Sequence, residues 1–259
     1  LFGIPQSYIA GSIVTNGPGD FEHDVFLTRG ESRSSASKFR VGDVDNTIIK
    51  KIDVNWVVGN GLGGFPSALT LAANTWYHVF RIQNPTTLVS DAGYDTALDA
   101  ANLRADAVGF TEYRRVGSVL TDGVANIIPL IAHEIGGGAV LYSWVATPAD
   151  DKNGAIATGP RETIGLTVPT GYKVQAIFTV NDNGSGGGGT TLFSDLAIDD
   201  EVIDQATGKL GQLATISSAN RDGAQPTILT DVSGQIGGRA QSAKTIRIQT
   251  VGWIDFRRA

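Results

Sequence analysis

The chain of 259 residues is 41% hydrophobic and 18% charged, a balance that excludes an intrinsically disordered polypeptide. Its formal net charge of −6 and the lack of a basic stripe argue against binding to a phosphate backbone, so we expect no nucleic-acid partner. It has no cysteine, which excludes disulfides and thiolate metal sites, and no apolar run long enough for membrane insertion. Methionine is also absent, so Leu1 is not a translation start, and we interpret the chain as a processed product or a segment of a longer polypeptide.

Alternation of apolar and polar residues with a period of two recurs along the chain and predicts half-buried strands. It is clearest in residues 53–58, 76–82, 173–180 and 244–254. In the last run, Ile246 and Ile248 face one way, whereas Val251 and Trp253 fall on the opposite phase. This change of phase predicts a β-bulge near Gly252.

Three further segments have a distinctive composition. The glycines at residues 136–138 predict the turn of a hairpin between residues 127–135 and 139–145. The run GSGGGG at residues 184–189 predicts a long hairpin tip, because strand patterning resumes on both sides of it. Residues 96–107 contain good helix formers and predict either a short helix or a polar connection.

Short strands with frequent Gly, Asn and Asp turns favour an all-β fold over a parallel α/β sheet. We expect a β-sandwich or jelly-roll-like architecture with an N-terminal β-rich arm. The glycine-rich stretch around residues 59–74 is the one weak domain boundary in the sequence. We therefore expect an N-terminal β-rich arm or small β module at residues 1–73 and a β-sandwich domain at residues 74–259.

No arrangement of residues indicates catalysis or a cofactor. His78 lies in an aromatic strand, where a structural, hydrogen-bonded histidine is expected. His23 stands between Glu22 and Asp24, and His133 precedes Glu134; adjacent residues of an extended strand point to opposite faces, so neither set can jointly chelate one ion if extended. A nucleophile elbow, a phosphate loop and a dinucleotide fingerprint are absent. We expect no enzymatic activity, no catalytic residues and no cofactor.

Five acidic residues cluster in the C-terminal half of the chain: Asp195, Asp199, Asp200, Glu201 and Asp204. Carboxylate oxygens are suitable calcium ligands, but the spacing does not match an EF-hand loop. The default interpretation is a solvated acidic loop, and structural calcium is the alternative.

Exposed aromatic rings can bind sugars through their apolar faces and polar rims. Trp144, beside Tyr142 and close to a Pro-Ala-Asp-Asp loop, is a candidate glycan contact, and Tyr94 is another. Packing in the core or at an interface is the alternative for each of them. Trp56, Trp76 and Trp253 lie within alternating strands and are expected in the core.

Several stretches resemble virion appendage proteins of tailed phages, the tail fibre, spike and tail-associated structural proteins. They are residues 73–80 (ANTWYHVF), 91–95 (DAGYD), 113–123 (YRRVGSVLTDG), 168–171 (VPTG) and 250–255 (TVGWID). The resemblance implies an all-β virion module on the exterior of the phage particle, generally a homotrimer. It brings no pattern of binding residues, so no functional residue is transferred from it.

We therefore expect a structural module of a tail fibre or spike that acts in assembly and host-surface attachment. Its expected partners are copies of itself, neighbouring virion proteins and a host-surface glycan. A head-decoration or head-fibre protein of the capsid is one alternative, and a lectin-like carbohydrate-binding module is another. A glycan depolymerase remains the enzymatic alternative, although no carboxylate pair stands out for it.

Overall fold

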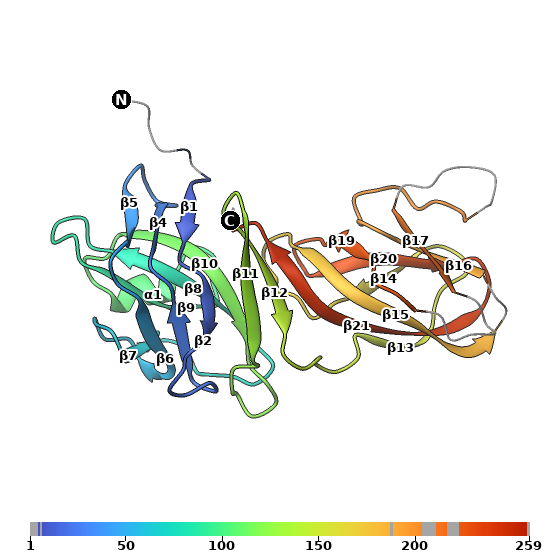
Figure 1. Ribbon diagram of the computed structural model, residues 1–259, viewed down its shortest axis with the longest axis horizontal. Helices are drawn as coiled ribbons and strands as arrows, with labels where there is room; N and C mark the ends of the chain where they lie inside the picture. The colour runs from blue at the N-terminus through green and yellow to red at the C-terminus, as the bar shows by residue number, and fades with distance from the viewer. Residues whose placement is uncertain (1–4, 6, 187–188, 204–210, 217–222, 258–259) are drawn as a thin grey trace. The chain divides into compact units, whose positions relative to one another are not determined.

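The computed structural model of the chain describes residues 5, 7–186, 189–203, 211–216 and 223–257 (Figure 1). Strands account for 49% of the structure and helix for 3%, and the strands pair in several antiparallel sheets. The fold is therefore all-β and of the sandwich class, which confirms the expected fold class.

The chain forms two compact units. Unit 1 comprises residues 1–145 and 255–259, and unit 2 comprises residues 146–254. The division expected between residues 73 and 74 is not found, because both sides of that boundary belong to unit 1. The last described residues of the chain belong to unit 1, so unit 2 is an insertion in the sequence of unit 1.

Unit 1 contains three small sheets and a hairpin. The first sheet has the order β1 (Ile9–Gly11), β4 (Gly30–Arg33), β5 (Arg40–Asp43). The second has the order β2 (Val14–Asn16), β3 (Asp24–Leu27), β6 (Ile48–Asn55), β7 (Leu62–Phe65). The third has the order β10 (Glu112–Leu120), β8 (Trp76–Gln83), β9 (Ser90–Asp95). The hairpin joins β11 (Leu130–Gly136) to β12 (Ala139–Trp144).

The N-terminal strands are part of the core of unit 1 and do not form a separate arm. The ring of Trp56 packs edge-on against Phe110 at a centroid distance of 5.5 Å. Arg81 on β8 donates to the carbonyl oxygen of Thr28 at 2.7 Å, which ties the third sheet to the N-terminal segment. Strands of three or four residues bury too little surface to be stable alone, so their inner faces pack against the central strands β8, β9 and β10.

The helix-like segment contains one short helix, α1 (Ala101–Asp106), and turns on either side of it. Leu103 is its buried residue and packs in a cluster with Phe80 and Phe110. The carboxylate of Asp95, at the end of β9, accepts the backbone N–H of Leu103 at 2.9 Å, which holds the helix against the sheet. The helix interpretation of this segment is therefore confirmed.

Unit 2 is built from two sheets. In one sheet β21 (Lys244–Asp255) pairs with β13 (Lys152–Ala155) and with β15 (Gln175–Gly186), and β15 also pairs with β18 (Gly223–Ala224) and β19 (Thr227–Leu229). The other sheet has the order β14 (Glu162–Gly165), β20 (Gln235–Ala240), β16 (Gly189–Ser194), β17 (Gln212–Ile216). The rings of Phe178 on β15 and Phe193 on β16 meet edge-to-face at 5.3 Å, so the core of unit 2 lies between the sheets.

Two of the turn and bulge predictions are confirmed, and one is wrong. Ile177 pairs with Gly252 and Phe178 with Thr250, so Val251 is the extra residue of a bulge in β21. The turn between β11 and β12 has three consecutive glycines, residues 136–138, with φ of 95°, 62° and 80°, a region that favours glycine. The segment at residues 184–189 is not a hairpin tip, because β15 and β16 belong to different sheets. β15 ends at Gly186 in one sheet and β16 begins at Gly189 in the other, and residues 187–188 lie outside the described residues.

Candidate functional site

The three candidate glycan contacts are buried within unit 1. Trp144 is 7% exposed, and Tyr142 and Tyr94 are fully buried. Tyr142 and Trp144 lie on the inward face of β12, and Trp144 packs against Trp76 with ring centroids 5.9 Å apart. The hydroxyl of Tyr94 donates to the carbonyl oxygen of Lys50 at 2.7 Å. The expectation of an exposed aromatic platform at these residues is wrong, because their strands turn them toward the core.

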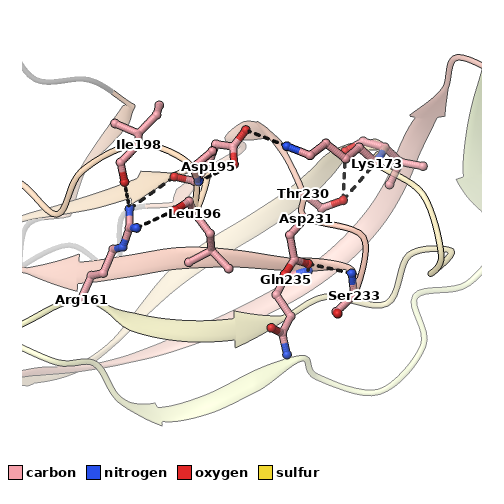
Figure 2. A network of polar contacts seen from close by, with 11 residues as sticks. Arg161, Lys173, Asp195, Leu196, Ile198, Thr230, Asp231, Ser233 and Gln235 are labelled. Atoms are coloured by element: carbon pink, nitrogen blue, oxygen red, sulfur yellow. Dashed lines mark hydrogen bonds and ion pairs between the residues drawn. The ribbon is translucent and has the colours of Figure 1, made fainter.

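Arginine side chains hold the acidic loop of unit 2. The guanidinium of Arg161 donates to the carbonyl oxygens of Asp195, Leu196 and Ile198, as Figure 2 shows. Asp200 accepts from the backbone N–H of Arg161 at 3.0 Å and from Arg239 at 3.2 Å. The positive charge next to these oxygens is therefore supplied by the chain itself.

The remaining members of the acidic cluster add no compact ligand set. Asp199 is exposed, and Asp204 lies outside the described residues. Among the residues that the structure describes, no three His, Asp or Glu side chains come together in a group that could hold a metal ion. The default interpretation is a solvated acidic loop; in the structure Asp195 and Asp200 of this loop also form ion pairs, with Lys173 and Arg239.

Unit 1 has an open cavity of about 330 Å³ beside the first sheet, lined by Tyr8, Ala10, Gly11, Arg29, Gly30, Glu31 and Val44. The hydroxyl of Tyr8 donates to the carboxylate of Glu31 at 2.5 Å, and Glu31 also pairs with Arg40 at 2.9 Å. The acidic side chain of the cavity is therefore engaged by neighbours within the chain, and the geometry indicates no ligand class.

A buried amine and a buried carboxylate meet between β6 and β9. The Nζ of Lys50 lies 3.2 Å from Oδ2 of Asp91, and the two side chains are 1% and 2% exposed. Burial lowers the pKa of Lys50 and raises the pKa of Asp91. Two backbone carbonyl oxygens, of Val57 and Gly59, also accept hydrogen bonds from this amine, at 2.7 and 3.2 Å. We call these two side chains the Lys50–Asp91 pair.

A second buried charge cluster holds the last described residues of the chain against unit 1. Arg115 on β10 donates through both terminal nitrogens to the two oxygens of Asp255, at 2.7 and 2.8 Å. The backbone N–H of Arg257 donates to Asp255 at 2.7 Å, and its guanidinium donates to the carbonyl oxygens of Gly138 at 2.5 Å and Gly11 at 2.7 Å. We call this set the Arg115–Asp255–Arg257 cluster.

Sequence reasoning missed both charge clusters, although one had a readable signal. Ile48, Lys50 and Ile52 occupy alternate positions of β6, and all three are buried. A lysine on the same phase as two isoleucines points inward and requires a partner. The partner, Asp91, lies on a strand of another sheet, and nothing local in the sequence identifies it.

A single carboxylate in unit 2, that of Asp151, accepts four hydrogen bonds. Its Oδ1 accepts the backbone N–H and the hydroxyl of Thr167, both at 2.7 Å. Its Oδ2 accepts the backbone N–H and the hydroxyl of Thr250, at 2.6 and 2.7 Å. Asp151 thereby links the segment after β14 to the middle of β21.

We expect Asp151→Asn to lower the free energy of unfolding of unit 2 by about 1–3 kcal/mol, because an amide nitrogen would face donors that now bond a carboxylate. The loss should be measured as faster amide hydrogen exchange in β15 and β21 of the variant than in the same strands of the wild type. The matched control is Asp150→Asn, which alters the neighbouring, more exposed pair with Arg247 and should change little. Equal exchange in the two variants would contradict the role given to Asp151.

No protein-family model, no curated protein and no solved structure matches the chain. Of the helices among the described residues, none has the length and apolar character needed to cross a membrane.

Proposed function

We propose that the chain is a structural module of a tailed-phage appendage, a tail fibre or spike, on the exterior of the virion. In this role it assembles with copies of itself and with neighbouring virion proteins and contributes to host-surface attachment. The likeness of residues 73–80, 113–123 and 250–255 to such proteins supports the proposal, as does the all-β sandwich class of the fold.

The observation that carries the proposal is the exposed edge of strand β11. Ile131 and Ile135 of this strand are 46% and 50% exposed, and Ile135 lies where the register with β12 shifts. Within unit 1, the described strand that pairs with β11 is β12, so β11 is an edge strand there; at its start, the N–H of Leu130 donates to Oδ1 of Asn16 at 2.9 Å. An edge strand with exposed apolar side chains promotes pairing with another chain, and an assembling protein covers such an edge.

A homotrimer suits this surface and the attachment role. Closed symmetry would cover the β11 edge of every copy at once, whereas a monomer would leave it in water. Three copies also present three identical binding surfaces, and weak single contacts then combine into a strong one.

We expect the purified chain to be a trimer by native mass spectrometry or light scattering at micromolar concentration. The double variant Ile131→Lys/Ile135→Lys should be a folded monomer, since two buried ammonium groups would oppose the contact. The matched control Val108→Lys/Val124→Lys changes two still more exposed valines of unit 1 and should remain trimeric.

A monomeric wild-type chain would count against a self-assembling fibre or spike module. If that monomer bound isolated phage heads, the head-decoration alternative would replace the proposal. The attachment role is tested separately by asking whether the purified chain reduces the adsorption of phage to host cells. A trimer that does not reduce adsorption would limit the function to assembly.

A further inference from the structure

We infer that the side chains of Lys50 and Asp91 join in an intramolecular amide bond between Nζ of the lysine and Cγ of the aspartate. The inference rests on how the two groups are placed, oriented and shielded inside unit 1. It is independent of the virion role proposed above.

The two reacting groups are already in contact. Nζ of Lys50 is 3.2 Å from Oδ2 of Asp91, which places the amine beside the carboxyl group it would attack. Reacting groups held about 3–3.5 Å apart in a fixed orientation gain much of the advantage of an intramolecular reaction. Both side chains are buried and both are held by further hydrogen bonds, so the geometry is maintained by the fold.

The hydrogen bonds of Lys50 orient its amine. Nζ donates to the carbonyl oxygens of Val57 and Gly59, at 2.7 and 3.2 Å. Its third direction faces Asp91. A neutral amine has two hydrogens and one lone pair, so two hydrogens on the two carbonyl oxygens leave the lone pair directed at the carboxyl group.

The carboxyl group of Asp91 is held by backbone donors. The N–H of Gly59 lies 3.2 Å from Oδ2, and the N–H of Ala92 also donates to this carboxyl group. Such donors stabilise the negative charge that develops on oxygen when a nucleophile adds to a carbonyl carbon. Gly59 has a φ of 126°, which lets one residue direct its N–H to the carboxyl group and its carbonyl oxygen to the amine.

The surroundings favour the reactive protonation state. Burial lowers the pKa of Lys50 and raises the pKa of Asp91, and both directions favour transfer of a proton from ammonium to carboxylate. The ring of Trp56 covers the amine, with Nζ 5.7 Å from the ring centroid. The indole N–H of Trp56 donates to the carbonyl oxygen of Ala92 at 3.1 Å, which fixes this cover in place.

The reaction is a condensation without any external reactant. The lone pair of the neutral Nζ attacks Cγ of the protonated Asp91, and an N–C bond forms. A proton moves from nitrogen to the hydroxyl oxygen, the C–O bond breaks, and water leaves. The products are one amide and one water molecule, and no group is oxidised or reduced.

The bond would connect β6 of the second sheet to β9 of the third. It would close the chain between residues 50 and 91 and so restrict the unfolded state, as a disulfide does in other chains. This chain has no cysteine, so the amide would supply a covalent cross-link that reduction cannot break.

The test is the mass of the intact, denatured wild-type chain and of its proteolytic peptides. We expect the chain to be lighter than its sequence by one water molecule and to yield a branched peptide that joins the Lys50 and Asp91 segments. Lys50→Arg should have the full mass of its sequence. Asp91→Asn should lose ammonia in place of water, because the leaving group changes from hydroxyl to amide nitrogen. Lys152→Arg is the matched control, since it alters a more exposed Lys–Glu pair at 3.1 Å and should keep the water loss.

A wild-type mass equal to that of the sequence, with no branched peptide, would overturn the inference. So would a water loss confined to a linear peptide around Asp91, because that result indicates a cyclic imide of the aspartate alone. Persistence of the water loss in Lys50→Arg would lead to the same conclusion.

Discussion

Replacing Asp255 with alanine should lower the free energy of unfolding of unit 1 by about 3–5 kcal/mol, the range for breaking a buried ion pair by removing one partner. Asp255 accepts two hydrogen bonds from Arg115 and one from the backbone of Arg257. The side chains of Asp255 and Arg115 are both buried. The substitution would leave the charge of Arg115 in the interior without this carboxylate, and desolvated charge is far more costly than a lost surface contact.

Urea denaturation followed by tryptophan fluorescence measures the effect, because Trp56, Trp76 and Trp144 are all in unit 1. The control is Arg40→Ala, which breaks the exposed pair with Glu31 and should cost about 0–1 kcal/mol. If Asp255→Ala were as stable as this control, the Arg115–Asp255–Arg257 cluster would contribute little to the stability of unit 1, and the expected role of Asp255 would be wrong.

The same cluster explains why unit 1 needs residues from both ends of the described chain. Arg257 donates to the carbonyl oxygens of Gly11 and Ser12 near the N-terminus and of Gly138 in the β11–β12 turn. These backbone acceptors lie more than a hundred residues from Arg257 in the sequence. A fragment that stops at Val145 would contain the acceptors but not the donor, so unit 1 and unit 2 cannot be separated by a single cut without loss.

Local features of the fold could be predicted from the sequence, and long-range ones could not. The strand at residues 76–82, the bulge in β21 and the turn at residues 136–138 depend on neighbouring residues, and all three are confirmed. The boundary at residues 73 and 74 and the hairpin at 184–189 depend on which sheet each strand joins. Period-two alternation shows that a segment is a strand, but it does not identify the partner strand.

The candidate sites show the same limit. The alternation around Tyr142 and Trp144 places both on one face of a strand, but it does not say whether that face is inner or outer. The sequence indicates the acidic loop but not its partner Arg161, because the two are brought together by strand β20, which pairs with both β14 and β16. The likeness to phage appendage proteins stays a prediction, to be decided by assembly and adsorption measurements.

Acid should destabilise unit 1 through His78. Burial, together with the charge of Arg115, lowers the pKa of His78 from 6.5 to about 3. Between these two pH values the unfolded chain binds a proton at His78 that the folded chain does not. The free energy of unfolding therefore has its full value, as far as His78 is concerned, above pH 6.5, and it decreases as the pH falls below 6.5. The loss amounts to about 1.4 kcal/mol for each pH unit in this window. Carboxylates in general also titrate at the acidic end, so the effect of His78 must be isolated by comparison with a variant.

The comparison is with His78→Gln, whose amide can keep a hydrogen bond to the hydroxyl of Ser118, now 2.9 Å from Nδ1 of the histidine. Glutamine does not titrate, so the variant should be less stable than the wild type above pH 6.5 and should approach or exceed it in acid. The free energies of unfolding of the two proteins are measured by urea denaturation at pH 7.5, 6, 5 and about 4, and the value for His78→Gln is subtracted from the value for the wild type. If this difference decreases steadily as the pH is lowered, the fold holds His78 neutral. A difference that does not change with pH would mean that His78 takes up its proton without unfolding, and that the interior around Arg115 admits a further positive charge.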